Sequence, residues 1–156
     1  MLRLDNPQPK KMQNRETTII QTTGQVKTGD TMKTILRLEE AAMFVLSIVL
    51  FNSLSLGWWW YAVFILSPDL SMAGYLFNNP VGAFCYNLFH HKGIAILLYI
   101  SGLYLHNQIL QFAGLILFGH SSMDRMLGYG LKYAEGFAFT HLGKIGNTQG
   151  EQYGKI

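Results

Sequence analysis

Long apolar runs separated by short polar breaks dominate the middle of the sequence. The pattern predicts four helical segments, which cover residues 35–56, 57–77, 81–105 and 107–127. Each is close to the ~20 residues that cross about 30 Å of hydrocarbon at 1.5 Å per residue. Runs such as AAMFVLSIVLF and GIAILLYISGLYL lack the polar stripe of a water-soluble helix. The sequence therefore predicts an all-α, integral membrane, up-down four-helix bundle.

Composition favours the same interpretation. Hydrophobic residues make up 49% of the chain and charged residues 13%, about half of the roughly 25% that is usual in soluble domains. Residues 41–118 carry only two formal charges, on Asp69 and Lys92. Three consecutive tryptophans at residues 58–60 are typical of an aromatic belt at a membrane interface. The basic residues are mixed with acidic ones, which argues against nucleic-acid binding and leaves the lipid bilayer as the expected partner.

The flanking segments predict an orientation and a division of the chain. Lysine and arginine lie on both flanks of the apolar region and are absent from the turns predicted at the opposite side, so both termini are expected in the cytoplasm. Residues 1–31 are polar and are expected to form a disordered extension, which would make Met32 the start of the folded unit. Residues 32–146 then form the membrane domain, and residues 147–156 a flexible C-terminus.

A glycine-rich segment follows the fourth predicted helix. Five glycines between residues 128 and 146 argue against a long regular helix, while the apolar residues among them argue against a free tail. We expect a loop folded under the cytoplasmic face of the bundle, which would carry Lys132 and His141 toward the polar side chains of the helices. The alternative is an interfacial anchor whose aromatic rings lie at the level of the lipid headgroups.

Polar side chains in all four segments fall at a similar depth. Counting about 1.5 Å per residue from the cytoplasmic ends places the following residues in the inner half of the bundle: Glu39, Glu40, Asp69, Asn87, His90, His120 and Asp124. The spacings of three and four residues put Asn87 with His90, and His120 with Asp124, on shared helix faces. A charge in hydrocarbon costs about 2.5–3.5 kcal/mol unless it faces a partner or a wet cavity. The sequence therefore predicts a single polar pocket that opens to the cytoplasm.

The residue types in this pocket suit a metal site. Histidine and carboxylate ligands together fit zinc, iron or manganese, and the predicted ligands are Asp69, His90, His120 and Asp124. Catalytic roles are predicted for Glu39, Glu40, His120, Asp124 and Lys132, with one of the two glutamates as general base. Substrate binding is predicted for Asn87, Arg125, Tyr129 and His141, and an anionic group would be received by Arg125 or Lys132. A zinc-activated water would make the protein a hydrolase that acts at the lipid surface.

Structural explanations compete with this hypothesis. Glu39 and Glu40 lie where a helix would begin and would interact favourably with its dipole. Asp69 would repair a kink at Pro68, and Lys92 would pair with Asp69. Two further functional classes stay open. The first is a non-catalytic protein that binds a small ligand or handles protons or ions, for which a homo-oligomer would supply enough spans. The second is a polar cluster that only holds helices together.

Five motifs carry a resemblance to a known family. They are MKTILRLEEAAMF, PDLSMAGY, YNLFHH, HSSMDRMLGYGLKY and FTHLGKIG. With them, residues 32 to about 146 resemble a family of small bacterial membrane proteins called domain of unknown function 4260. The resemblance implies a multi-pass protein of the bacterial inner membrane and supplies no reaction. The extension before Met32 departs from the family pattern.

Overall fold

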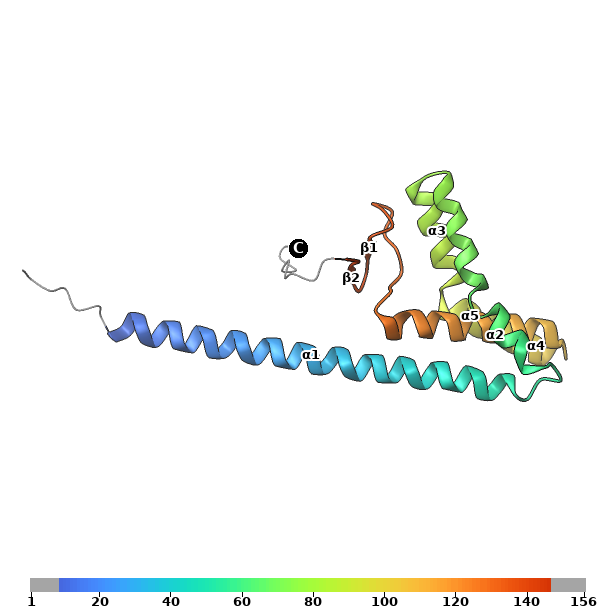
Figure 1. The fold of residues 1–156 in the computed structure, drawn as a ribbon, viewed down its shortest axis with the longest axis horizontal. Coiled ribbons are helices and arrows are strands. Elements are labelled where there is room, and N and C mark those ends of the chain that lie inside the picture. The colour runs from blue at the N-terminus through green and yellow to red at the C-terminus, as the bar shows by residue number, and fades with distance from the viewer. Residues whose placement is uncertain (1–8, 147–156) are drawn as a thin grey trace, which may run out of the picture. The chain divides into compact units, whose positions relative to one another are not determined.

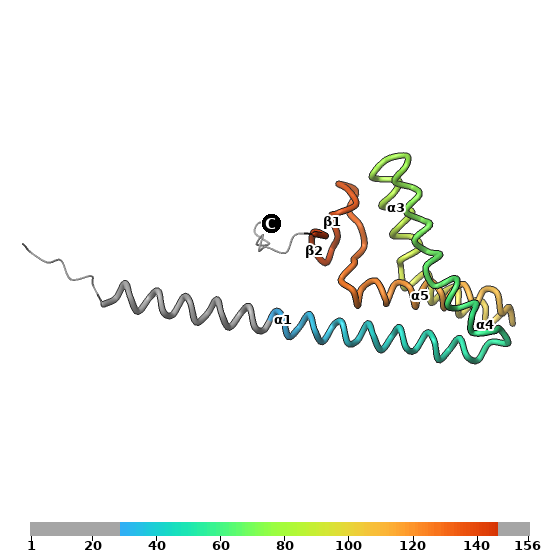
Figure 2. The backbone as a smooth tube through the Cα atoms, in the orientation of Figure 1, coloured from blue at the N-terminus to red at the C-terminus, as the bar shows by residue number. Residues whose placement is uncertain are grey.

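A computed structural model describes the backbone of residues 9–146 and the side chains of residues 29–146 (Figure 2). The predicted flexible C-terminus, residues 147–156, and the first eight residues of the predicted extension lie outside this part of the chain. The chain divides into two units, Met1–Leu36 and Arg37–Ile156. Helix α1, Pro9–Phe51, begins in the first unit, so residues 9–31 are helical where the sequence predicts a disordered extension.

The second unit is mainly helical up to residue 127, and the glycine-rich segment after it is not (Figure 1). After α1 come α2 (Trp58–Phe64), the 3-10 helix η1 (Ser67–Leu76), α3 (Asn79–Phe89), α4 (Lys92–Tyr104) and α5 (Gln108–Leu127). Two short strands, β1 (Phe139–Thr140) and β2 (Gly143–Lys144), pair antiparallel in the glycine-rich segment. The all-α prediction is therefore confirmed. Among the described residues, no helix combines the length and the apolar character that crossing a membrane requires.

The prediction of one continuous helix over residues 57–77 is wrong. Helix α2 ends at Phe64, and the 3-10 helix η1 begins at Ser67. Pro68 causes this change, because it has no N–H and its ring collides with the preceding turn of an α-helix. The backbone N–H of Asp69 then donates to Leu66 O over 3.3 Å, a tighter bond that spans three residues rather than four.

The prediction of one continuous helix over residues 81–105 is wrong as well. Helix α3 ends before His90, and α4 begins after His91. The ring of His91 caps the new helix, since its Nδ1 accepts a hydrogen bond from Ile94 N at 3.3 Å. This side chain satisfies a donor that a helix start otherwise leaves unpaired.

The fourth predicted segment is confirmed as helix α5. Its start is capped by the side chain of Asn107, whose Oδ1 accepts hydrogen bonds from Ile109 N and Leu110 N at 2.9 and 3.2 Å. Its end is capped by Gly128 in the left-handed conformation, with φ +95°, as is common where a helix stops at glycine. These caps fix both ends of the helix that carries His120 and Asp124.

Small residues bring α4 and α5 together, and the two helices lie side by side (Figure 1). A Cβ added at Gly114 of α5 would lie 2.6 Å from Tyr99 N and 2.8 Å from Ala95 O, both on the backbone of α4. On the other side of α5, the core consists of Phe51, Leu54, Tyr61, Leu115 and Ile116. Helix α5 is thus held between α4 and a core built by the end of α1 and by α2.

We predict that Gly114→Ala lowers the free energy of unfolding by about 1–3 kcal/mol, because the added methyl group forces the two helix backbones apart. Gly29→Ala is the matched control: a Cβ at Gly29 in α1 would meet nothing within 4 Å, so this change should be neutral or slightly stabilising. Denaturant unfolding followed by circular dichroism measures both. Equal stability of the two variants would contradict the close packing of α4 on α5.

Candidate metal centre

Four side chains converge at the centre of the second unit. Asp69 comes from η1, His90 from the end of α3, and His120 and Asp124 from α5. Each offers one ligand atom, and these atoms all lie within 4.8 Å of one another. Both histidines are buried, while the Asp69 side chain is 37% exposed. The convergence that the sequence predicts for these four residues is therefore present.

Backbone carbonyls fix both imidazole rings. His90 Nδ1 lies 2.8 Å from Tyr86 O, and His120 Nδ1 lies 2.7 Å from Ile65 O. A carbonyl oxygen can only accept, so each Nδ1 carries the hydrogen that it donates. In a neutral imidazole, Nε2 is then left as an acceptor. Burial lowers the pKa of His90, which favours the neutral ring.

The carbonyl that holds His120 is available because of Pro68. In a regular helix, Ile65 O would accept from the N–H three or four residues later. Pro68 has no N–H, and Asp69 N donates to Leu66 O instead. The sequence predicts that Asp69 repairs this kink, but in the structure the ring of His120 donates to the free carbonyl of Ile65.

The remaining ligand atoms are acceptors that face one another. His90 Nε2 and His120 Nε2 lie 3.0 Å apart. Asp69 Oδ1 lies 3.6 and 3.3 Å from the same two nitrogens, and the Asp124 oxygens lie 3.5 and 3.8 Å from them. With both Nδ1 atoms as donors, no hydrogen is left for any of these contacts. The cluster therefore needs a positive charge at its centre, as a proton or a metal ion.

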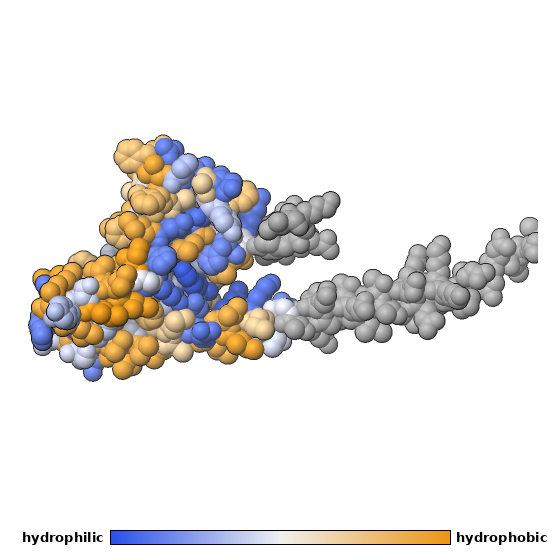
Figure 3. All heavy atoms as spheres, turned by 180° about the vertical axis from the view of Figure 1, so that it is seen from behind, coloured by the Kyte–Doolittle hydropathy of each residue, from blue (hydrophilic) through white to orange (hydrophobic). Residues whose placement is uncertain are grey.

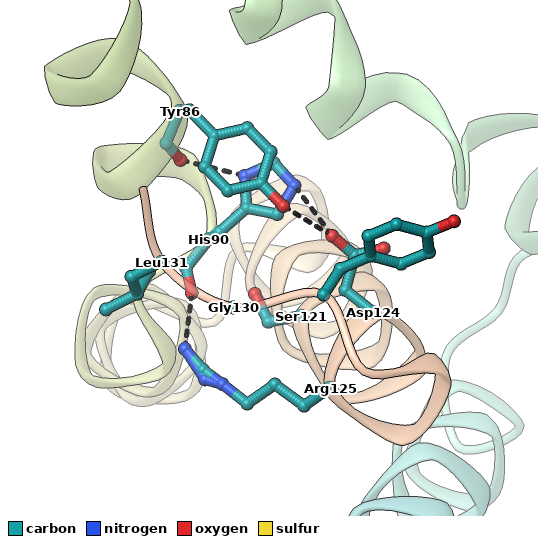
Figure 4. A pocket seen from close by; sticks show the side chains of 8 residues that line it. Tyr86, His90, Ser121, Asp124, Arg125, Gly130 and Leu131 are labelled. Atoms are coloured by element: carbon teal, nitrogen blue, oxygen red, sulfur yellow. Dashed lines mark hydrogen bonds and ion pairs between the residues drawn. The ribbon is translucent and has the colours of Figure 1, made fainter. Parts of the chain in front are cut away.

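Tyr86 holds two of the four ligands and was not identified from the sequence. Its hydroxyl donates to Asp124 Oδ2 over 2.7 Å, and its ring stacks on His90 with centroids 3.7 Å apart (Figure 4). Burial, reinforced by Asp124, raises the pKa of Tyr86, so the hydroxyl keeps its hydrogen. The spacing of four residues between Tyr86 and His90 on one helix face is the signal that would have indicated this role.

Arg125 and Tyr129 line a small pocket beside the cluster, together with Tyr86, His90 and Asp124 (Figure 4). Arg125 Nη2 donates to His90 O over 3.3 Å. Its Nε is buried and has no hydrogen-bond partner. Of the four predicted substrate-binding residues, these two are therefore next to the centre.

The side chains of Asn87 and His141, the other two predicted substrate-binding residues, form hydrogen bonds to backbone groups. Asn87 Nδ2 donates to Lys132 O over 2.8 Å, and Asn87 Oδ1 accepts from Lys132 N at 2.7 Å. His141 Nδ1 accepts from Leu131 N at 2.8 Å, and its ring is otherwise exposed. The two bonds of Asn87 dock the glycine-rich segment on α3, and the bond of His141 joins two parts of that segment. Lys132 is buried as a result, with Nζ 3.9 Å from the ring centroid of Phe137 and 5.1 Å from that of Tyr86.

The structure does not bring Glu39 and Glu40 to the cluster. Glu40 forms an ion pair with Lys92, and Glu39 is exposed on α1. The predicted pairing of Lys92 with Asp69 is therefore wrong, because the break before α4 places Lys92 at the start of a separate helix that faces Glu40. Burial lowers the pKa of Lys92, and Glu40 opposes that shift.

Comparison with known proteins gives one match. The model of a family described as "Domain of unknown function (DUF4260)" matches residues 33–145, which agrees with the resemblance that the sequence motifs carry. No curated protein and no solved structure matches the chain.

We predict that Asn87→Ala releases the glycine-rich segment, because it removes both hydrogen bonds to the Lys132 backbone. The loss should cost about 1–3 kcal/mol of unfolding free energy and should speed hydrogen exchange at the Lys132 amide. Asn52→Ala is the control, since Asn52 is an exposed residue just after α1. An unchanged exchange rate in Asn87→Ala would contradict this role.

Proposed function

This chain belongs to the family described as a domain of unknown function, DUF4260, and we propose that its four converging side chains bind a divalent transition-metal ion used for hydrolysis. The observation that carries the proposal is the 3.0 Å approach of two Nε2 atoms whose rings already donate from Nδ1. A single proton can lie between only two of the facing acceptors. A metal ion accepts electron pairs from all of them at once.

The distances between the ligand atoms support a metal ion. Tetrahedral zinc with bonds of about 2.0–2.2 Å places its ligand atoms roughly 3.3–3.6 Å apart. The five contacts among the Nε2 and carboxylate atoms span 3.0 to 3.8 Å. The hydrogen bonds from both Nδ1 atoms to carbonyls, and from Tyr86 to Asp124, match the outer contacts that usually orient metal ligands. Iron and manganese accept the same mixture of histidine and carboxylate.

Hydrolysis requires a position on the ion for water. Four protein ligands fill a tetrahedral ion, so the water would take a fifth position or the place of Asp69, the most exposed of the four. When bound, a divalent ion lowers the pKa of a coordinated water to about 7 and polarises the bond to be cleaved. The reaction would be hydrolysis of an ester: one water would add to the electrophilic atom, the ester bond would break, and the leaving oxygen would take a proton. The chain's own part is to hold the ligands, with Tyr86 keeping Asp124 in place.

We predict that protein purified without chelator contains about one divalent metal per chain and that His120→Asn loses it, because an imidazole ligand is removed. His106→Asn is the matched control, since His106 is exposed and has φ +52°, which asparagine tolerates. Elemental analysis measures the metal. As a second readout, added metal should raise the melting temperature of the wild type and of His106→Asn, but not of His120→Asn. A wild type that stays metal-free after incubation with zinc, manganese and ferrous iron would refute the proposal.

We also propose that the second unit lies in a lipid bilayer, so that this chemistry takes place at the membrane. The support comes from α4, in which the small residues are buried and large apolar residues are exposed. The buried positions of α4 are Ala95 and Gly102, whereas Leu97 and Ile100 are 66% and 53% exposed. Small residues at helix contacts and large apolar residues outside are typical of membrane helices, and exposed apolar patches of this extent are rare on soluble monomers.

The surface agrees with this proposal (Figure 3). On the face shown, hydrophobic residues gather over the end of the unit that contains α4, and hydrophilic residues form a band beside them. Exposed large apolar residues of α2 and α4 include Trp58, Trp59, Leu97, Ile100 and Leu103. In a bilayer, lipid chains would cover these side chains, and the tryptophans would lie at the interface.

We predict that the protein sediments with membranes, resists extraction by high salt and requires detergent for release. Leu97→Asp should destabilise the protein in lipid, by about 2.5–3.5 kcal/mol if the position lies near the bilayer centre. Ala134→Asp, at an exposed position of the glycine-rich segment, should change stability by less than about 0.5 kcal/mol. Recovery of the wild type in the aqueous fraction, with Leu97→Asp as stable as Ala134→Asp, would refute the placement in lipid.

A further inference from the structure

Two basic side chains lie next to the metal centre without a carboxylate of their own. Neither Lys132 nor Arg125 forms an ion pair with any residue that the structure describes. Lys132 is 4% exposed, and lysine is almost never so buried without a partner. Arg125 carries five N–H donors, of which one reaches His90 O, while the buried Nε has no acceptor.

Both cations are held in place by the fold. The side-chain amide of Asn87 hydrogen-bonds both the N–H and the C=O of Lys132. The ammonium group of Lys132 lies over the rings of Phe137 and Tyr86. Arg125 is in the last turn of α5, directly after Asp124. Burial lowers the pKa of Lys132, and the negative charges of Asp124 and Asp69 oppose that shift.

The formal charge around the centre becomes more positive when a metal binds. Without metal, Lys132, Arg125 and the proton that the cluster needs together exceed the two negative charges of Asp69 and Asp124 by one. A divalent ion neutralises the two carboxylates and leaves the two cations uncompensated. Glu40 does not alter this balance, because it is paired with Lys92. The loaded site therefore has an excess of two positive charges in surroundings that are largely closed to solvent.

From this charge balance and from the unused donors of Arg125, we infer that the metal-loaded site binds a phosphate monoester, with its phosphate group held by Arg125 and Lys132 beside the ion. A phosphate monoester carries close to two negative charges at pH 7 and three acceptor oxygens. Guanidinium and ammonium groups both bind phosphate well. The inference rests on the proposed metal-dependent function and names its class of substrate. The phosphate belongs either to a water-soluble monoester or to a lipid headgroup such as phosphatidic acid.

The test is calorimetric titration of inorganic phosphate into the full-length protein. The metal-loaded wild type should bind phosphate at least tenfold more tightly than the metal-free protein, because the loaded site carries more positive charge. Lys132→Met, which keeps the length of the side chain, should lose at least tenfold in affinity, and Lys132→Arg should restore it. Lys144→Met is the matched control, because Lys144 also lies over an aromatic ring, 5.3 Å from the Phe139 centroid, but is exposed. It should bind phosphate as the wild type does.

Elemental analysis and thermal melts of every variant separate the outcomes. A protein that binds no metal refutes the proposed function and this inference together. A protein that binds metal but shows equal phosphate affinity in Lys132→Met and Lys144→Met refutes only the inference, as does equal binding with and without metal. If Lys132→Met does not fold, unchanged phosphate affinity in the folded Arg125→Gln variant would overturn it. Competition experiments identify the source of the phosphate. Displacement of bound phosphate by glycerol phosphate indicates a water-soluble monoester. Displacement by vesicles that contain phosphatidic acid, but not by vesicles of phosphatidylcholine alone, indicates a lipid headgroup.

Discussion

The Nε2 atoms of His90 and His120 lie 3.0 Å apart, and each belongs to a ring whose Nδ1 already donates to a backbone carbonyl. Two lone pairs therefore face each other, with carboxylate oxygens of Asp69 and Asp124 around them. Such an arrangement is repulsive until a positive charge occupies its centre. Because the four side chains come from η1, α3 and α5, whatever supplies that charge also joins three separate elements. The packing of η1, α3 and α5 against one another therefore depends on this contact.

The fold keeps that contact in place with small residues and polar hydrogen bonds more than with a large apolar core. Gly114 and Gly102 let α5 approach the backbone of α4, while large apolar residues of α4 point outward. On the next turns of α5, the buried residues are His120, Ser121 and Ser122. A helix pair built in this way gains little from the hydrophobic effect between its helices in water. Close backbone packing and the charged cluster must then supply the specificity of the arrangement.

The four side chains of the cluster could be predicted from the sequence. The helix breaks and some of the contacts could not, because they depend on local backbone features. The convergence of Asp69, His90, His120 and Asp124 followed from depth and helical spacing, because polar groups in apolar helices must find one another. The helix breaks were not predicted, since hydropathy registers apolar content and not the missing N–H of Pro68 or the capping ring of His91. The partners of Glu40 and Asn87 depend on those breaks. Tyr86 was overlooked because an aromatic residue in an apolar run looks like ordinary core.

The two interruptions that the hydropathy pattern conceals are the features that build the site. The break at Pro68 leaves Ile65 O free for His120 Nδ1, which sets the tautomer of that ring. The break after α3 places His90 at a helix end, where its carbonyl accepts a hydrogen bond from Arg125. Continuous helices would have satisfied both carbonyls internally and left His120 and Arg125 without these contacts. The irregular backbone is therefore what lets η1, α3 and α5 bring these four side chains together, with Arg125 bonded beside them.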